Sequence, residues 1–567
     1  MNESETKQCQ NCKQDFVIES EDFAFYEKMK VPAPTFCPEC RFQRRLMFRN
    51  ERVLYKRKCD LCSKPMVTIF SPEKPYKVYC QECWWSDKWD ASEYAMDYDP
   101  NKGFFEQYKE FQKKVPFMSL FVSYTTLVNS DYINHAGYAK NCYLIFNADY
   151  NENVYYGTSV VRDKDSMDAL RLVDSELCHE IIMSVECYRA FFSEDCRNCT
   201  DVYFSKALRG CSNCFGCINL QNKNYYIFNN PYSKEDYKNE IKKYKLDSFS
   251  AVEELKKKVR EFWMGFPNKF MTAVQNENVS GDYIAYSKNA HYMYQARGVE
   301  NGKFCQWITE APAKDVYDFT EWGNGAELIY ESIAVGEGAN SIKFCFGVWD
   351  NTLNVEYSML SANCSNIFGC LNLTKKSYCI FNKQYSKEEY EKLRARIIED
   401  MDSNPYIDSK GRVFKYGEFF PYDLSFFGYN ETSAMQLFPL SEDAILEKGW
   451  RWEKIQRGNY EITITGDKIP DSINDVNESI LQEILGCANC GKAFKMVRGE
   501  YDLLKRFAFP IPRKCPDCRH MDRMARINPP RLWIRKCDKC GKDMQTSYAP
   551  DRPEIVYCEA CYQQEVV

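Results

Sequence analysis

Residues 211–241 read CSNCFGCINLQNKNYYIFNNPYSKEDYKNEI, and residues 364–394 read CSNIFGCLNLTKKSYCIFNKQYSKEEYEKLR. The two stretches align without a gap, 153 positions apart. Upstream the likeness is weaker, as in AKNCYLIF from residue 139 and SKNAHYMY from residue 287. The centre of the chain is therefore predicted to contain two copies of one unit.

Each unit has the texture of many short strands. A polar residue followed by aromatic, β-branched or cysteine residues recurs roughly every 10–15 residues, as at Asn141 and Asn153. Such spacing is typical of a sandwich, a barrel or a solenoid. Asparagine at recurring positions suits the stacked turns of a parallel β-solenoid, so we predict coils of roughly 20–24 residues with two strands each. An antiparallel β-sandwich is the alternative.

Helices are expected to close both units. Ser233 and Ser386 each begin a capping box, which predicts charged helices over 233–262, with a break, and over 386–401. The bridging region that follows predicts a short helix within 442–454, a strand over 459–465 and a helix over 471–486.

The two ends of the chain carry cysteine pairs. Eight C-x2-C pairs occur, and each pair in the C-terminal set lies 478 positions after its N-terminal counterpart. Two such pairs close one tetrahedral thiolate site, which suits Zn2+. The absence of a secretion signal argues against disulfides. Paired in sequence order, the predicted ligands of four zinc sites, each made of four cysteines, are Cys9, Cys12, Cys37 and Cys40; Cys59, Cys62, Cys80 and Cys83; Cys487, Cys490, Cys515 and Cys518; and Cys537, Cys540, Cys558 and Cys561.

The segments CQNC…CPECR and CANC…CPDCR resemble a zinc-ribbon, treble-clef-like domain. With the closing SYAPDRPEIVYCEACYQQEV, nearly the full chain resembles a family of uncharacterised bacterial zinc-ribbon proteins. The resemblance implies zinc at the sixteen terminal cysteines and implies no established activity. Cys37-Pro-Glu-Cys40 also resembles a rubredoxin knuckle, which keeps an iron electron carrier as an alternative.

Thirteen further cysteines lie in the central units. Cys211, Cys214 and Cys217 have metal-ligand spacing, but the second copy has Ile367 in place of Cys214. Buried free cysteine packs as a small hydrophobic residue. We therefore expect these thirteen residues to pack in the core, with an additional metal site as the alternative.

Charge is distributed unevenly along a chain whose net charge is −6. Residues 1–84 hold 15 basic and 12 acidic residues, and residues 487–562 hold 16 and 9, so basic ends flank an acidic centre. Arginine pairs with phosphate, and interleaved aromatic residues can stack on bases. The basic modules are therefore predicted to contact RNA or DNA, with pairing to carboxylates of the acidic solenoid as the alternative. The predicted nucleic-acid-binding residues are Arg41, Arg44, Arg45, Arg49, Arg57, Lys58, Arg519, Arg523, Arg526, Arg531, Arg535 and Lys536, with Phe42, Phe48, Tyr55 and Trp533 as possible stacking residues.

Little in the sequence indicates catalysis. The chain has four histidines, and nucleotide-binding loops, nucleophile elbows and His-Glu-x-x-His motifs are not found. Asp163, Asp165 and Asp168 are available carboxylates, but turns of a solenoid are rich in aspartate for structural reasons.

We thus predict a mainly β, cytoplasmic, non-enzymatic zinc protein that contacts nucleic acid, with a protein-binding scaffold as the alternative. Neither a signal peptide nor a membrane-spanning segment is expected. The predicted domains are zinc modules at 1–90 and 487–567, a helical linker at 91–128, repeat units at 129–265 and 279–401, and a bridging α+β region at 402–486.

Overall fold

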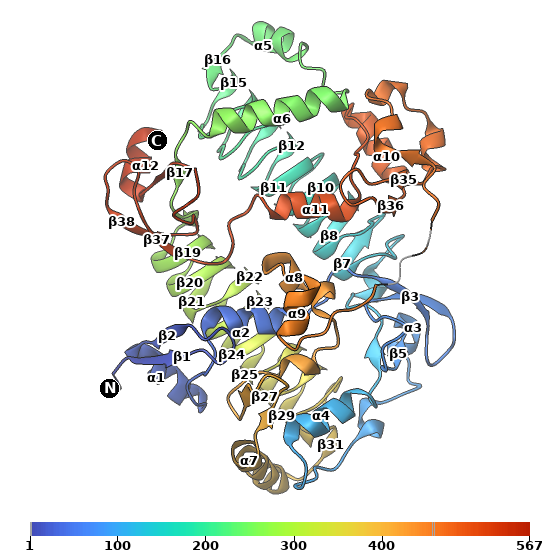
Figure 1. The fold of residues 1–567 in the computed structure, drawn as a ribbon, viewed down its shortest axis with the longest axis vertical. Helices are drawn as coiled ribbons and strands as arrows, with labels where there is room; N and C mark the ends of the chain where they lie inside the picture. Colours follow the sequence, from blue (N-terminus) through green and yellow to red (C-terminus); the bar gives the residue numbers. More distant parts are fainter. Residues whose placement is uncertain (1–2, 456–457, 459, 567) are drawn as a thin grey trace.

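The computed structural model describes residues 3–455, 458 and 460–566. Two parallel β-solenoids form its centre (Figure 1). Cysteine clusters lie near both termini. The first solenoid runs from β7 (Asn134–Lys140) to β16 (Asn230–Pro231). The second runs from β18 (Ala273–Val274) to β31 (Lys383–Gln384). The predicted fold class is confirmed.

The coils are shorter than the sequence suggested. In the first solenoid, Thr200 pairs in parallel with Ser212, and Ser212 pairs in the same way with Asn224, so each coil is short. Asn141 and Asn153 occupy equivalent positions in adjacent coils and share a hydrogen bond, so one coil is 12 residues long. In the second solenoid some coils are slightly longer, as shown by the pairing of Glu300 with Lys314. The predicted coil length was therefore wrong, and the parallel pairing excludes the sandwich.

A period of three residues explains the short coil. From Tyr138 to Ala207, every third residue adopts a left-handed backbone with φ between 47° and 60°. The residue after each of these corners is buried, beginning with Ala139 and Cys142. Four corners therefore close one coil, and each side contributes one side chain to the interior. So narrow a coil accepts mainly small interior side chains, which is why Ala, Ser, Cys and Val recur there.

Corner residues form ladders along the outside. The side-chain amide of Asn129 donates to Asn141 (3.2 Å), Asn141 donates to Asn153 (3.0 Å), and Asn153 donates to Asp165 (2.7 Å). Asparagine tolerates the left-handed conformation better than most residues, so it supplies both the corner and the ladder. The expected stacked asparagine turns are present.

The central cysteines lie inside the coils. The Cys178 thiol lies 3.4 Å from the carbonyl oxygen of Glu176 and donates to it, and Ser166 makes the same bond to Lys164 O (2.8 Å). Cysteine and serine thus occupy equivalent interior positions and make the same hydrogen bond. This agrees with the prediction that the central cysteines pack in the core. All thirteen are buried: Cys142, Cys178, Cys187, Cys196, Cys199, Cys211, Cys214, Cys217, Cys305, Cys345, Cys364, Cys370 and Cys379.

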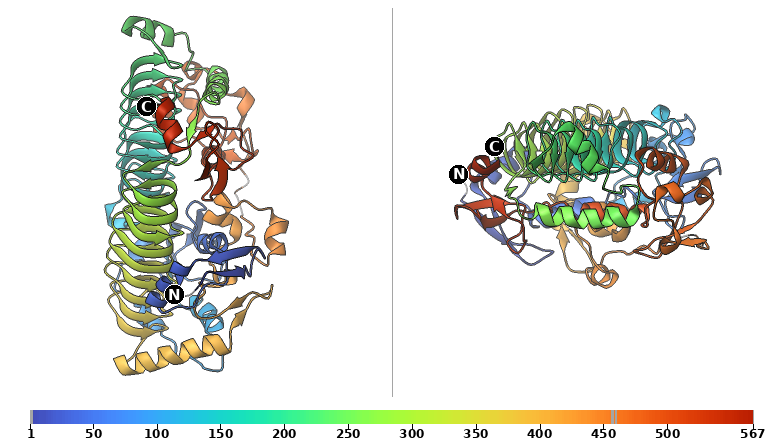
Figure 2. Two further views of the ribbon diagram at one scale, coloured as in Figure 1. Left: turned by 90° about the vertical axis from the view of Figure 1, so that its left-hand side faces the viewer. Right: turned by 90° about the horizontal axis from the view of Figure 1, so that it is seen from above.

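The two solenoids lie side by side and run in opposite directions. Tyr283, in the first coils of the second solenoid, donates to Asp195 (3.3 Å) well along the first. Phe121, at the start of the first, meets Phe346 in the second with ring centroids 6.1 Å apart. The terminal modules and the bridging region lie mainly on one side of the resulting wall (Figure 2).

Helices close both solenoids as expected. Ser233 accepts a hydrogen bond from Asp236 N (3.1 Å) at the start of α5 (Lys234–Ile241), and a second helix, α6 (Phe249–Trp263), follows the break. Ser386 forms the full capping box of α7 (Lys387–Ser403). Helices α5 and α7 pack on the last parallel strands, β15 (Asn224–Ile227) and β30 (Ser377–Ile380), which would otherwise expose unpaired edges. Helix α6 lies along the side of the first solenoid, where Lys256 pairs with Glu180 (2.7 Å).

The bridging region follows the predictions in part. The short helix is α9 (Glu442–Glu447), and the strand is reduced to β34 (Ile464–Thr465), with residue 459 outside the described residues. The helix expected over 471–486 was wrong. That segment forms the short 3-10 turns Ile473–Asp475 and Glu478–Leu481, because Ser472 and Asn477 each cap a new turn.

The narrow interior of the coils leads to a prediction about the stability of core variants. Ile181→Ala should lower the free energy of unfolding by about 2–5 kcal/mol, because the side chain is fully buried and rigid neighbours cannot fill the space. Thr200→Ala, on an exposed strand position, is the control and should change it by less than about 0.5 kcal/mol. Urea denaturation measures both, and equal effects would contradict the described interior.

Candidate metal centres and their docking helices

Four groups of cysteines converge, two in each terminal module. Within each group the sulfur atoms all lie within 4.8 Å of one another. The four groups are those predicted by pairing the C-x2-C motifs in sequence order. Among the described residues, these four groups have a geometry that suits a metal ion. Each could hold a metal ion.

The spacing of the sulfur atoms fits a tetrahedral thiolate site. Across the knuckles, Sγ–Sγ distances are 3.7 Å for Cys12–Cys37 and 3.8 Å for Cys62–Cys80. They are 3.8 Å for both Cys490–Cys515 and Cys540–Cys558. A tetrahedron with metal–sulfur bonds of about 2.3 Å has edges of about 3.8 Å.

Backbone amides favour the thiolate form that metal binding needs. In every site the N–H of the third cysteine donates to the sulfur of the first, as Cys558 N does to Cys537 (3.3 Å) and Cys515 N to Cys487 (3.2 Å). Burial opposes ionisation, yet these and neighbouring amides lower the pKa of Cys537 and of Cys487 to about 6. The backbone amides around each site thus stabilise the thiolates that would bind a metal cation.

One helix grows out of the first site of each module. In the N-terminal module, α2 (Pro38–Leu46) begins immediately after Cys37 and contains Cys40. In the C-terminal module, α11 (Pro516–Met524) has the same relation to Cys515 and Cys518. Proline at the first helical position suits this start. A metal ion would therefore fix the beginning and direction of both helices.

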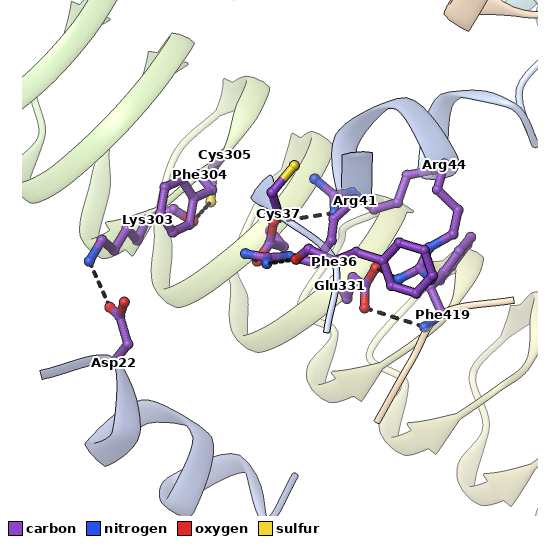
Figure 3. A network of polar contacts seen from close by, with 12 residues as sticks. Asp22, Phe36, Cys37, Arg41, Arg44, Lys303, Phe304, Cys305, Glu331 and Phe419 are labelled. Carbon is purple, nitrogen blue, oxygen red and sulfur yellow. Dashed lines mark hydrogen bonds and ion pairs between the residues drawn. The ribbon is translucent and has the colours of Figure 1, made fainter. Parts of the chain in front are cut away.

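Helix α2 presses its arginines into the second solenoid (Figure 3). Arg41 lies 2.7 Å from a carboxylate oxygen of Asp318, and Arg45 lies 3.4 Å from the other oxygen. Arg44 pairs with Glu331, one coil beyond Asp318. The three arginines are at most 1% exposed.

Further carboxylates complete this buried network. Arg44 also pairs with Glu418 of the bridging region (2.9 Å). Arg49, just beyond the helix, pairs with Glu51 (2.6 Å) and with Glu321. Burial raises the pKa of Glu321 to about 7, although the guanidinium of Arg49 opposes that shift. The side chains of this network are almost inaccessible to solvent.

Helix α11 repeats the arrangement on the first solenoid. Arg519 and Arg523 both lie 2.8 Å from Asp168. Arg519 also pairs with Glu500 (2.9 Å), and Arg526 pairs with Glu194. Arg519 and Arg523 correspond to Arg41 and Arg45, so each module presents two arginines, four positions apart, to one solenoid aspartate.

The two aspartates occupy equivalent places in the solenoids. Asp168 lies four coils before Gly216, and Asp318 lies four coils before Gly369. The two glycines match in the repeat. The acidic binding face is therefore duplicated together with the solenoid.

This burial corrects the predicted nucleic-acid surface. Arg41, Arg44, Arg45, Arg49, Arg519 and Arg523 are buried against carboxylates or backbone oxygens, so in this fold they offer no surface to nucleic acid. Pairing with the acidic solenoid, the alternative reading, is what the structure shows. The candidate stacking residues Phe42, Phe48 and Tyr55 are buried too, and Trp533 is half-buried.

The other predicted contacts have mixed positions. Arg57 pairs with Asp60 (2.9 Å), and Arg535 makes the equivalent pair with Asp538 (3.0 Å). Both also bond backbone carbonyls of the following loop, so they fasten that loop to the module. Arg526 is mostly covered by its partners, whereas Arg531, Lys58 and Lys536 keep exposed side chains.

The carboxylates considered for catalysis have structural roles. Asp168 holds two arginines, Asp165 pairs with Arg506 (2.9 Å), and Asp163 lies inside the coil, where it accepts from Ser175 N (2.9 Å). Burial lowers the pKa of the neighbouring His179 to about 4, so it is neutral near pH 7.

Comparison with known proteins adds little to this picture. No family model and no curated protein matches the chain. A solved structure described as an acetyltransferase from Desulfovibrio desulfuricans G20 has 9% identity and a TM-score of 0.10. The alignment covers 52% of this chain and 86% of that one, and at such a score it carries no argument. Within the described part of the chain, no helix is long and apolar enough to cross a membrane.

The sequence reading missed the acidic partners of the arginines. Asp318, Glu331 and Asp168 look like ordinary solenoid turn residues when read alone. A usable signal existed, because both solenoids place an aspartate and then a glutamate at the same corner of adjacent coils, Asp168 with Glu180 and Asp318 with Glu331.

Removing one of these carboxylates should be costly. Asp318→Asn leaves Arg41 and Arg45 buried without their anion and should lower the free energy of unfolding by about 3–5 kcal/mol. Asp315→Asn is the matched control, since Asp315 pairs with the half-exposed Lys28 at the surface and should cost less than about 1 kcal/mol. Thermal or urea unfolding distinguishes them, and similar losses would mean that the buried pairs are not what holds α2.

Proposed function

We propose that the chain is a non-enzymatic scaffold in which four structural zinc ions hold two β-solenoids in a fixed relation and a protein partner binds the outer solenoid surface. The burial of the arginine helices carries this proposal. Modules whose cationic helices are covered by the protein's own carboxylates serve internal assembly.

Zinc is the proposed metal because the donor set is sulfur alone and each site is closed. Four thiolates leave no open coordination position for substrate, which is the pattern of structural rather than catalytic zinc. Iron in rubredoxin-like sites remains the alternative metal. It would make the protein coloured, whereas zinc thiolate sites are colourless.

Metal analysis tests this assignment. The purified protein should be colourless and carry four zinc equivalents, and Cys59→Ser with Cys62→Ser should reduce this to three. The control is the triple change of Cys211, Cys214 and Cys217 to Ala, which should keep four because those thiols lie inside the coil and bond backbone carbonyls. Iron at stoichiometric level, or loss of metal from the triple variant, would contradict the proposal.

An exposed tyrosine column marks the proposed partner surface. Tyr138 and Tyr150 occupy one corner of adjacent coils, with their rings stacked 4.3 Å apart, and are 50% and 55% exposed. Tyr124 and Val128, at the start of the same solenoid, are also exposed. Tyrosine is enriched at protein interfaces, where it buries a large area at low entropic cost.

A cavity adjoins this column. It has a volume of about 820 Å3 and lies between the second metal site of the N-terminal module and the first coil, with Tyr124 in its wall. Thr126, two residues on, accepts a hydrogen bond from Tyr138 N (2.6 Å), which joins the cavity wall to the column. The cavity thus extends the tyrosine surface inward.

The charges around the cavity favour a protein over a polyanion. Lys56 and Lys64 are balanced by Glu82 and Asp131, and Lys64 pairs with Glu82 (2.7 Å). A nucleic-acid site would need an excess of positive charge. A neutral, half-apolar surface with exposed tyrosines suits a polypeptide.

Nucleic acid remains the second candidate partner on one narrow observation. Lys58 and Lys536 are exposed at equivalent positions of the two modules, and Arg531 is exposed nearby in the C-terminal one. These cations are few, so any such binding would be weak and sensitive to salt.

Affinity capture with the zinc-loaded, full-length protein separates the two candidates. The combined change Tyr138→Ser and Tyr150→Ser should reduce recovery of a specific protein partner by about tenfold or more, because it removes the stacked anchors. Tyr286→Ser, a comparably exposed corner tyrosine of the second solenoid, is the control and should retain the partner. Recovery that disappears after nuclease treatment would transfer the proposal to nucleic acid, and recovery unchanged in the double variant would reject the tyrosine surface.

A further inference from the structure

Several contacts between residues 1–265 and residues 266–567 come in reciprocal pairs. The N-terminal module belongs to the first half, yet α2 docks on Asp318 in the second. The C-terminal module belongs to the second half, yet α11 docks on Asp168 in the first. Each half therefore supplies one module and one receiving face, and each face is filled by the other half (Figure 1).

A second reciprocal pair lies where the solenoids begin and end. Asn219, late in the first solenoid, donates to Pro267 O at the entry of the second (2.8 Å). Asn372, late in the second, donates to Pro116 O at the entry of the first (2.7 Å). Asn219 and Asn372 match in the repeat, so one bond is made twice with the halves exchanged.

The modules also meet each other in a reciprocal way. Arg52 of the first half faces Asp517 of the second (3.8 Å), and Arg531 of the second faces Glu39 of the first (3.6 Å). Asp517 and Glu39 are equivalent residues, each two positions after the cysteine that starts its helix. In all three sets the two halves exchange roles, as in an isologous dimer interface, although in the third set Arg531 aligns with Val53 and not with Arg52.

Contacts inside each half follow the same rule. The second metal site of the N-terminal module pairs β5 (Val78–Tyr79) with β6 (Phe117–Met118), which leads into the first solenoid. The second site of the C-terminal module pairs β39 (Val556–Tyr557) with β17 (Asn268–Lys269), which leads into the second. Each module thus spans its own solenoid and the opposite one.

We propose that the chain is a fused dimer: each half contains one copy of a unit made of a module and a solenoid, and the solenoid faces around Asp168 and Asp318 are binding sites for the arginine-bearing module of a second such unit. In the first half the module precedes the solenoid, and in the second it follows. The order within the second half is therefore permuted while the interface keeps its twofold pattern. The interface, and not the covalent connection, holds the halves together.

Cutting the connection in the intact protein tests this. A protease site is inserted between Met264 and Gly265, both exposed between α6 and β17, in the full-length zinc-loaded chain. The uncut variant must first elute and bind metal like the parent. After cleavage, the two fragments should elute together at the size of the intact chain and keep the full metal content. Fragments that separate at physiological ionic strength would overturn the proposal.

Partner exchange and a matched variant extend the test. Cut protein with a tagged first half, mixed with untagged cut protein, should acquire untagged second halves. The change of Asp168 and Asp318 together to Asn should weaken association of the cut halves by more than about tenfold, since it removes the carboxylate that Arg41 shares with Arg45 and the one that Arg519 shares with Arg523. Asp201→Asn is the control and should leave association unchanged, because Asp201 pairs with Arg189 of its own half (2.5 Å). Halves that never exchange, or that associate equally well without both aspartates, would contradict recognition through these faces.

Discussion

The fold depends on two solenoid aspartates that each receive two buried guanidiniums. Burying an arginine costs free energy unless a carboxylate pairs with it. The helices that carry Arg41 with Arg45 and Arg519 with Arg523 can therefore be buried only against a surface that offers a carboxylate. This requirement fixes where each terminal module lies and, through the modules, how the two solenoids are placed. Charge pairing therefore sets the specificity of the assembly, while apolar burial inside the coils supplies most of its stability.

Metal ions bound at the cysteine groups would make this docking precise. Helices α2 and α11 start at cysteines of these groups, so a bound metal would fix the position of each helix. An arginine needs such a rigid support to reach a buried carboxylate. The second site of each module is joined by a short parallel strand pair to the entry of its own solenoid. Two sites per module thus link two solenoids, which gives a physical reason for the tandem arrangement.

The cysteine groups and the closing helices could be predicted from the sequence. The coil length and the partners of the arginines could not, for physical reasons. The four cysteine groups could be predicted from the C-x2-C spacing, because the cysteines of each group lie close together in the sequence. The closing helices could be predicted from the capping residues Ser233 and Ser386. The short coil was missed because its period of three mixes corner Asn and Asp with interior Ala, Ser and Cys. The arginine partners could not be found because Arg41 and Asp318 lie 277 positions apart and pair across two different repeats.

Hydrogen–deuterium exchange with and without a metal chelator tests the central claim most directly. If metal-supported helices hold the solenoids, removing metal should raise exchange in α2 and α11 and also in the coils that carry Asp318 and Asp168 in the opposite half of the chain. Exchange that rises in the cysteine modules alone, while both solenoid faces stay protected, would show that the faces do not depend on the docked arginines and would contradict the account.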